Sequence, residues 1–237
     1  MNEAVVRRAQ GEGFLPVATW LLRPPAAEPA SPLVSARLQL EAGRAICAAH
    51  EIDVRVHGDR PEGPALLVTN HVGYFDPMIV AGLVGCIGVA KKELRGWPII
   101  GWRLRELGVV FVDRSSPWSG AVALRSMLRA FRAGASVLNF PEGTTTDGRD
   151  VLPFRAGAFG AARIAGVPVV PVRLDYDDAR IAWTGTATFL PHYAGVVWRG
   201  NVRATVTFGE PIPTDRAVEP RALADAARDA IRSMRRA

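Results

Sequence analysis

Residues 65–77 of the chain read ALLVTNHVGYFDP. Ala65 to Thr69 is a short apolar run of strand length, and it ends in the polar pair Asn70-His71. Residues 77–84 then carry an apolar pattern that fits a helix. A buried strand that ends in polar side chains and leads into a helix is typical of α/β proteins, in which such loops carry the chemistry.

The same alternation extends in both directions along the chain. Further strands are expected at residues 52–57, 87–90, 109–112, 136–140, 167–174 and 202–208. Helices are expected at residues 33–49, 119–132, 158–165 and 223–234. The pattern predicts an α/β fold: a single domain with a mixed, largely parallel sheet flanked by helices, plus an N-terminal arm and helix. We place the arm at residues 1–32 and the domain at residues 33–237.

Composition and charge narrow the class of protein. The chain has 237 residues, of which 49% are hydrophobic and 22% charged, so whole-chain disorder is excluded. The formal net charge is +6, and Lys91 and Lys92 are the only lysines among 29 basic residues. So many arginines favour a nucleic acid, an anionic membrane or a phosphorylated substrate as partner, or reflect only a GC-rich genome. The uncharged and mostly apolar run at residues 77–90 is too short to cross a bilayer.

His71 and Asp76 are the first candidates for catalysis. They can meet if the chain turns into a helix directly after His71. The carboxylate would then hold one ring nitrogen and leave the other as a base near neutral pH. Because no serine or cysteine accompanies them, the pair suits direct activation of a substrate hydroxyl. The alternative is a surface histidine beside an aspartate that caps a helix.

Two more apolar runs end in polar residues. After residues 109–112, the guanidinium of Arg114 suits a phosphate, or else a salt bridge at a strand end. Residues 140–144 read FPEGT, a tight turn that lifts the Glu142 carboxylate and the Thr144 hydroxyl out of the sheet. The alternative for that turn is a plain connection with a solvated glutamate. If these loops share one edge of the sheet, they converge on one site.

Two other segments have weaker signals. Arg155, in the sequence PFRAG, is a second candidate for binding a phosphate. Residues 167–172 read VPVVPV and contain no reactive atom. They either line an apolar channel or form an edge strand, which is the default reading of a strand that contains proline.

The order NHxxxxD, GxxFxDR, FPEGT and VPVVPV resembles the glycerolipid acyltransferase family, in particular its lysophosphatidic acid acyltransferase type. The resemblance covers about residues 52–210. It implies that His71 is the general base and that Asp76 orients it. It also implies that Arg114, Glu142, Gly143, Thr144 and Arg155 bind the acyl acceptor and its phosphate, and that residues 167–172 belong to the acyl part of the site. Two departures are small: Val where Ile is common in GVVFVDR, and Arg155 where the family often has lysine.

The resemblance implies an enzyme that moves a fatty acyl group from acyl-CoA or acyl carrier protein to a lysophospholipid. We expect 1-acylglycerol-3-phosphate as acceptor and phosphatidic acid as product. The acyl donor is a substrate, so no cofactor and no metal are expected. Two alternatives stay open: a different acceptor such as lyso-ornithine lipid, or a non-catalytic basic module that binds membrane or nucleic acid.

The expected location is the cytoplasmic face of the cell membrane, with peripheral attachment, and no nucleic acid is expected as partner. The acceptor and product are amphiphiles, so the site must reach a bilayer surface. Within the arm, residues 14–22 are mostly apolar and include Trp20, and Arg7, Arg8 and Arg23 flank them. Tryptophan and arginine together are typical of an interfacial segment on anionic lipid. The alternative is that residues 14–22 fold back onto the core.

Overall fold

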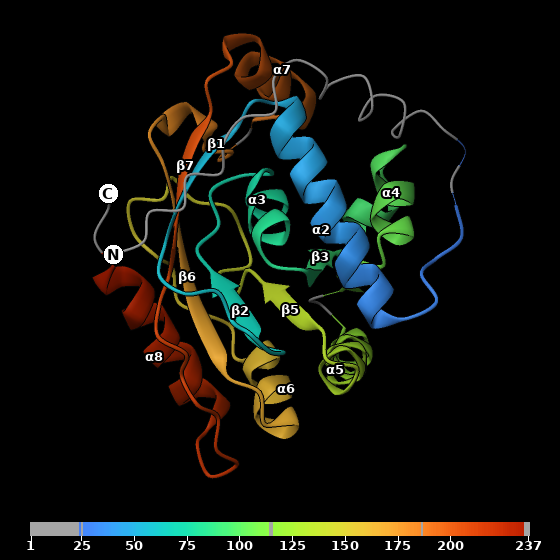
Figure 1. The fold of residues 1–237 in the computed structure, drawn as a ribbon, viewed down its shortest axis with the longest axis vertical. Helices are drawn as coiled ribbons and strands as arrows, with labels where there is room; N and C mark the ends of the chain where they lie inside the picture. The colour runs from blue at the N-terminus through green and yellow to red at the C-terminus, as the bar shows by residue number, and fades with distance from the viewer. Residues whose placement is uncertain (1–23, 25, 114–115, 186, 235–237) are drawn as a thin grey trace.

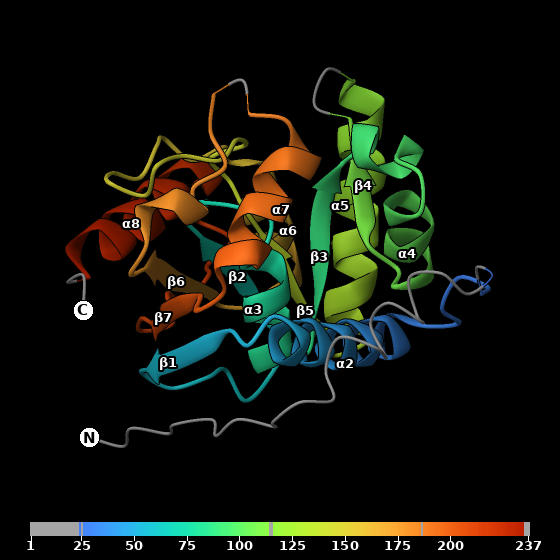
Figure 2. The same ribbon diagram turned by 90° about the horizontal axis from the view of Figure 1, so that it is seen from above.

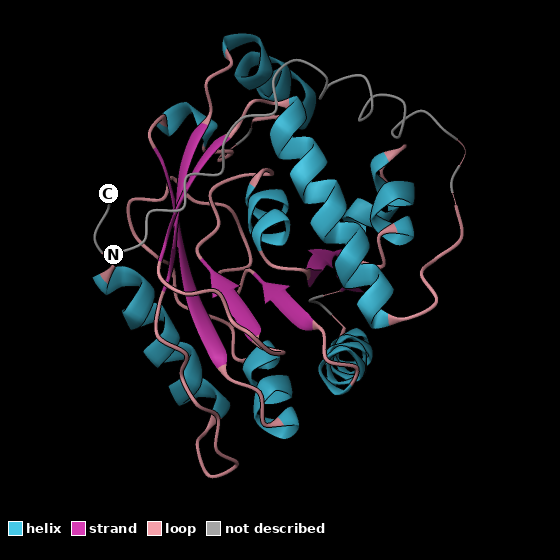
Figure 3. Cartoon of the chain, in the orientation of Figure 1, coloured by secondary structure: helices cyan, strands magenta, loops and turns pink. Residues whose placement is uncertain are grey.

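A computed structural model describes residues 24, 26–113, 116–185 and 187–234 of the chain. Within these residues a seven-stranded sheet forms the centre of the molecule, and helices cover both of its faces (Figures 1 and 3). The strands are β1 (Asp53–His57), β2 (Leu66–Thr69), β3 (Cys86–Lys91), β4 (Val110–Val112), β5 (Ser136–Asn139), β6 (Val169–Tyr176) and β7 (Arg203–Phe208).

The strand order is β1-β7-β6-β2-β5-β3-β4. Every neighbouring pair is parallel except β6 and β7, which are antiparallel. Because β2, β5, β3 and β4 run in the same direction, the loops that follow them leave from one edge of the sheet. The predicted α/β fold with a mixed, largely parallel sheet is therefore confirmed.

The helices of the described residues are named in chain order. They are α2 (Pro32–Ala49), α3 (Asp76–Leu83), α4 (Ile100–Glu106), α5 (Pro117–Arg132), α6 (Gly157–Ala165), α7 (Phe189–Arg199) and α8 (Pro220–Ser233), with short 3₁₀ helices η1 (Lys92–Gly96) and η2 (Ala179–Ile181). The side chains of α5, α6 and α8 pack into one core cluster, and those of α3 and α7 pack into another. Figure 1 shows α5 and α6 on one side of β2 and β5 and α3 on the other, and Figure 2 shows α2 and α3 side by side.

Strand β2 shows how the sheet separates these two cores. Leu66 and Val68 belong to the cluster of α5, α6 and α8, whereas Leu67 belongs to the cluster of α3 and α7. All three side chains are fully buried. Successive side chains on a strand point to opposite faces, so an uninterrupted apolar run is what a strand covered on both faces requires.

The helix α2 crosses α3 at close range. Its N-terminus is capped by the Ser31 side chain, which accepts a hydrogen bond from the backbone N–H of Val34 at 3.3 Å. A Cβ atom at Gly43 would lie 2.6 Å from the backbone nitrogen of Gly82, so only glycine permits this approach. The crossing fixes α3, which begins with a residue of the candidate site.

Two features of the fold differ from the prediction. The sequence pattern did not indicate α4 or α7. Residues 167–172 were expected by default at an edge, and this is wrong, because β6 lies between β2 and β7 in the interior of the sheet. Pro171 is tolerated there because the ladder with β7 begins one residue later, at the pair Val172 and Phe208.

Candidate active site

The candidate site lies where the neighbouring parallel strands β2 and β5 end. The loop after β5 holds both backbone polar groups of His71. The Glu142 carboxylate accepts a hydrogen bond from the His71 N–H at 2.9 Å, and the Thr146 N–H donates to the His71 carbonyl at 2.7 Å. The ring of Phe140 packs against the imidazole, with 4.2 Å between ring centroids. Two loops far apart in sequence therefore fix one histidine.

Asn70 ties the start of the first loop to strand β6. Its side-chain amide donates to the Leu174 carbonyl at 2.8 Å, and its side-chain oxygen accepts from the Leu174 N–H at 2.9 Å. The amide thereby continues the hydrogen bonding between β2 and β6 beyond the last residue of β2. This leaves His71 at a well-defined point on the edge of the sheet.

His71 and Asp76 meet as the turn into a helix requires, because α3 begins at Asp76. His71 Nδ1 lies 2.7 Å from Asp76 Oδ2. The same oxygen accepts the backbone N–H groups of Val72 and Gly73, at 2.6 and 2.9 Å. The hydroxyl of Tyr176, on β6, donates to Asp76 Oδ1 at 2.7 Å. Four donors thus surround one fully buried carboxylate, which is how a buried charge is stabilised.

These contacts decide which ring nitrogen of His71 is basic. A carboxylate only accepts hydrogen bonds, so Nδ1 carries the proton and Nε2 is the nitrogen that can take one up. The side chain of His71 keeps 22% of its surface exposed, whereas that of Asp76 is fully buried. The pair therefore presents one base to its surroundings, backed by a carboxylate.

Glu142 lies behind His71. One carboxylate oxygen accepts from the His71 N–H and the other accepts from the Leu152 N–H at 3.2 Å. Burial raises the pKa of Glu142 to about 7, although both backbone hydrogen bonds act in the opposite direction. The carboxylate thus joins two loops through their backbones.

A cavity of about 730 Å³ lies beside His71. Most of its lining is apolar and comes from β3, η1, α4, α3 and two loops, with Met78, Val89, Leu94, Trp97, Leu104 and Trp183 among the lining residues. Four charged residues also line it: Lys91, Glu93, Asp113 and Arg155. Such a cavity suits a ligand with a long apolar part and a charged group.

The structure places the predicted site residues in three groups. His71, Gly143, Thr144 and Arg155 line this cavity. Asp76 and Glu142 are buried behind the lining. Arg114 lies outside the described residues, although its neighbour Asp113 lines the cavity and pairs with Lys92.

The turn after β5 brings Gly143 and Thr144 to the cavity. Gly143 has φ +82° and donates its N–H to the Phe140 carbonyl at 3.2 Å. A positive φ costs little only for glycine, so the FPEGT sequence can make this turn. The Arg155 N–H donates to the Pro141 carbonyl at 2.9 Å, and this bond holds the backbone of Arg155 against the turn after β5.

Residues 167–172 do not line this cavity. Their valines are buried in the two cores on either side of β6. The apolar lining comes instead from β3, η1 and α4. Sequence reasoning also missed Tyr176, for which no local signal exists, since its partner Asp76 lies 100 positions away. Among the described residues, no three His, Cys, Asp or Glu side chains are grouped in a way that could hold a metal ion.

The chain belongs to the Acyltransferase family, whose family model matches residues 52–175. It is therefore an acyltransferase of the type that acts on lysolipids, and the non-catalytic binding module considered from its charge is not supported. Its curated relatives carry two kinds of name.

The lyso-ornithine lipid O-acyltransferases of Pseudomonas aeruginosa and Brucella abortus are 34% and 30% identical to it. The aligned parts cover 79% and 76% of this chain, and 74% and 75% of those proteins. The 1-acyl-sn-glycerol-3-phosphate acyltransferase of Neisseria meningitidis is 34% identical, over 69% of this chain and 65% of its own length. The relatives therefore leave the acceptor open.

A solved structure shares the fold. The crystal structure of the 1-acyl-sn-glycerophosphate acyltransferase PlsC from Thermotoga maritima matches with a TM-score of 0.56 and 24% identity. The match covers 83% of this chain and 78% of that one. Within the described residues, no helix is both long enough and apolar enough to span a membrane.

Proposed function

We propose that this chain transfers a fatty acyl group from acyl-CoA or acyl carrier protein to the hydroxyl of 1-acylglycerol-3-phosphate, giving phosphatidic acid. The observation that carries the proposal is the His71–Asp76 pair, 2.7 Å apart, beside a largely apolar cavity that Arg155 also lines. In this proposal His71 takes the proton of the hydroxyl, the apolar lining contacts an acyl chain, and Arg155 binds the phosphate.

The proposed reaction uses His71 as general base. Nε2 takes the proton of the acceptor hydroxyl while the hydroxyl oxygen attacks the carbonyl carbon of the thioester. A C–O bond forms, and the C–S bond of the tetrahedral adduct then breaks. The leaving thiolate takes the proton from the imidazolium, so His71 returns to its neutral form. Asp76 keeps Nδ1 protonated and stabilises the imidazolium between the two transfers.

Binding of the acceptor headgroup is assigned to the loops at the same sheet edge. Arg155 would form charge-assisted hydrogen bonds to the phosphate, and the Thr144 hydroxyl and the Gly143 turn would contact the acceptor nearby. Arg114 follows Asp113, a cavity-lining residue, and would be the second cation. No cofactor or metal takes part in the proposed reaction.

For Glu142 we propose a positioning role. Its two oxygens accept the backbone N–H groups of His71 and Leu152, at 2.9 and 3.2 Å. A carboxylate engaged in this way supports the histidine and the turn, and touches the acceptor only through them.

Lyso-ornithine lipid is the second candidate acceptor. Relatives of that name from P. aeruginosa and B. abortus support it. An ornithine headgroup carries an ammonium as well as a carboxylate, and the cavity lining includes the carboxylates of Glu93 and Asp113 beside its cations. The chemistry at His71 would be unchanged, because the acceptor group is again a hydroxyl.

The test is an acceptor panel. Purified protein is incubated with acyl-CoA, or separately with acyl carrier protein thioester, and with 1-acylglycerol-3-phosphate, lyso-ornithine lipid and neutral lysolipids. Mass spectrometry of the products should show phosphatidic acid, and the His71→Ala variant should form none above background. Acylation of lyso-ornithine lipid alone would select the second candidate. A folded protein that acylates no lysolipid would contradict both.

Because the acceptor and product reside in a bilayer, we also propose that the protein works at the cytoplasmic face of the cell membrane and attaches to it peripherally.

A further inference from the structure

The helix α7 is apolar on two opposite sides. Its inward side consists of Phe189, His192, Tyr193 and Val196, which follow the spacing of one helical face. Phe189 packs against Trp97 and Trp183, with ring centroids 5.4 and 6.0 Å apart. Both tryptophans line the cavity beside His71, so α7 lies directly against the candidate active site.

A second contact joins α7 to the loop between His71 and Asp76. The Tyr74 hydroxyl lies 3.1 Å from His192 Nδ1, and the Tyr74 ring packs against Phe189 with 5.3 Å between centroids. These contacts hold the orientation of α7 relative to the site.

The outward side of α7 is apolar as well. It consists of Leu190, Pro191, Ala194, Val197 and Trp198, at positions i, i+1, i+4, i+7 and i+8. Leu190 is 72% exposed and Trp198 is 92% exposed. A helix that is apolar on both sides normally has a partner on each. Figure 1 shows α7 at one extreme of the molecule's longest axis.

The charged residues within and next to α7 in sequence are basic. From residue 179 to residue 209 the sequence contains no aspartate or glutamate, and its charged residues are Arg180, Arg199 and Arg203. All three arginines are exposed. Asp178, just outside this stretch, pairs with Arg180, and Arg199 also helps to lower the pKa of its carboxyl. Arg199 adds a cation at the end of the apolar face, and this combination is complementary to a surface that is anionic outside and apolar beneath.

We propose that the outward face of α7 docks on the surface of a lipid bilayer that contains anionic lipid. The choice of a bilayer over a protein partner rests on the proposed function, since a lysolipid acceptor resides there. Tryptophan is favoured at the level of the lipid headgroups, and arginine beside it attracts anionic lipid. At about 1.5 Å per residue, an 11-residue helix is too short to span the bilayer, so it lies in the interface plane.

This docking also orients the cavity. Phe189 contacts the cavity-lining Trp97 and Trp183 from the inner side of the same helix whose outer side meets the lipid. In this orientation the cavity beside His71 is one helix away from the bilayer.

Vesicle binding tests the proposal with matched variants of the full chain. Leu190→Glu places a charge on the outward face of α7. Ile164→Glu makes the same kind of change at a 46% exposed residue of α6, which lies at the opposite end of the view in Figure 1. Trp198→Ala removes the most exposed aromatic side chain without adding charge. Each protein is sedimented with vesicles of phosphatidylcholine, alone or mixed with phosphatidylglycerol, at low and high salt.

The expected result is tighter binding of the wild type to vesicles that contain phosphatidylglycerol, with weakening by salt. Leu190→Glu should weaken that binding by about tenfold or more and Trp198→Ala by about threefold to tenfold, whereas Ile164→Glu should stay within about twofold. Transfer to vesicle-borne acceptor should fall in parallel, and transfer to acceptor dispersed in detergent should not.

Three results would overturn the proposal. The first is Leu190→Glu binding vesicles as the wild type does. The second is a wild-type dimer in analytical ultracentrifugation that Leu190→Glu dissociates without loss of vesicle binding, since a second copy would then cover α7. The third is an effect of Leu190→Glu only after removal of residues 1–30, since the arm would then be the occupant.

Because sedimentation needs no acyl donor, the docking surface and the proposed function can fail separately. A protein that acylates nothing but loses vesicle binding in Leu190→Glu would refute only the function.

Discussion

His71 and Asp76 lie five positions apart in sequence and meet because the chain turns into α3 at Asp76. Replacing His71 by alanine removes the proposed base while leaving the carboxylate bonded to Val72, Gly73 and Tyr176. We expect turnover to fall by about 10²–10⁴-fold with little change in the melting temperature. The measurement is initial rate of acyl transfer together with thermal unfolding.

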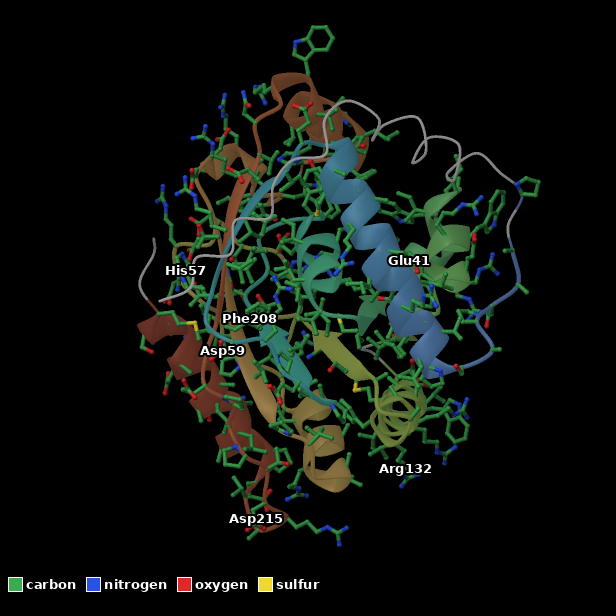
Figure 4. The ribbon with its side chains drawn as sticks, in the orientation of Figure 1. Glu41, His57, Asp59, Arg132, Phe208 and Asp215 are labelled. Carbon is green, nitrogen blue, oxygen red and sulfur yellow. The ribbon has the colours of Figure 1, made fainter. Side chains whose placement is uncertain are left out.

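The control for this variant is His57→Ala. His57 is labelled in Figure 4 and lies on β1, an edge strand remote from the cavity in sheet order. It should retain most of the activity. Near-normal turnover in a folded His71→Ala protein would refute the proposed mechanism. Asp76→Asn should also lose activity. The NH₂ of the new amide would face backbone N–H groups that donate hydrogen bonds to the carboxylate in the wild type.

Tyr176 acts on the site only through Asp76, to which its hydroxyl donates at 2.7 Å. Burial is the main cause that raises the pKa of Tyr176, so the hydroxyl stays a donor throughout the working pH range. Tyr176→Phe should lower kcat by about tenfold and leave both KM values nearly unchanged, since a hydrogen bond to a charged group contributes about 1.5–3 kcal/mol. Steady-state kinetics measure both quantities.

Tyr193→Phe is the matched control for Tyr176. It removes a hydroxyl that lies 2.6 Å from His50 Nε2 and does not contact Asp76. If the two variants have the same kcat, Tyr176 has no positioning role.

Glu142 makes stability depend on pH. Its folded-state pKa is about 7, above the ordinary value of 4.5. The native chain therefore keeps a proton that the unfolded chain has already lost. The resulting stabilisation is complete below the unfolded pKa and declines as the pH rises towards 7, by at most about 1.4 kcal/mol per pH unit.

Glu142→Gln should flatten this decline. The measurement is the free energy of unfolding in urea at several pH values between 5 and 8, for the wild type, Glu142→Gln and the exposed-residue control Glu62→Gln. The slopes against pH are compared, because a glutamine side chain at this position has one acceptor oxygen for two backbone N–H groups and will lower stability at every pH. Equal slopes in all three proteins would contradict the assignment.

At the scale of elements, the loops after the parallel strands assemble the acceptor site. Arg155 follows the turn at Gly143 and is held to it by its backbone bond to Pro141. If Arg155 binds the phosphate, Arg155→Ala should raise the acceptor KM by about ten- to a hundredfold and leave the donor KM within about twofold. Arg155→Lys should lie between, because lysine keeps the charge and loses the bidentate geometry.

Arg114→Ala should likewise raise the acceptor KM more than the donor KM. The same steady-state kinetics measure both quantities, with Arg132→Ala as control. Arg132 is labelled in Figure 4 at the end of α5 and lies away from the cavity lining. Equal effects of Arg114→Ala on donor and acceptor KM would indicate a structural salt bridge in place of phosphate binding.

At the scale of the whole molecule, the arm predicted to contact the membrane falls mainly on residues 1–23, which lie outside the described residues. Removing residues 1–30 retains Ser31, which caps α2, so the domain should fold. We expect the shortened chain to bind anionic vesicles less tightly, with a loss of about 1 kcal/mol for each basic residue removed near the surface. Vesicle sedimentation and transfer to vesicle-borne acceptor measure the effect.

Transfer to acceptor in detergent should survive this deletion better. Unchanged vesicle binding would show that the arm is not needed and would leave α7 as the proposed contact. Combining the deletion with Leu190→Glu shows whether the two segments contribute independently.

Several features of this protein follow from its sequence alone. Short apolar runs such as residues 65–69 fit strands covered on both faces, and their alternation with helices predicts a mixed, largely parallel sheet. Parallel strands end at one edge, so the sequence predicts that the segments around His71 and Glu142 meet if their strands share that edge. The five-residue spacing of His71 and Asp76 permits their contact if a helix starts directly after His71, and the family resemblance implies their roles as base and orienting carboxylate.

Other features were decided only by the tertiary structure. The inward turn of Glu142 and the contact of Tyr176 with Asp76 depend on the strand order, which places β2 between β5 and β6. The position of β6 in the interior depends on the antiparallel return of β7. The helix α7 has no polar face, so its pattern is not that of a surface helix. A periodic pattern reports which faces of one element are apolar, and only the packed chain determines which element, or which outside surface, covers each face.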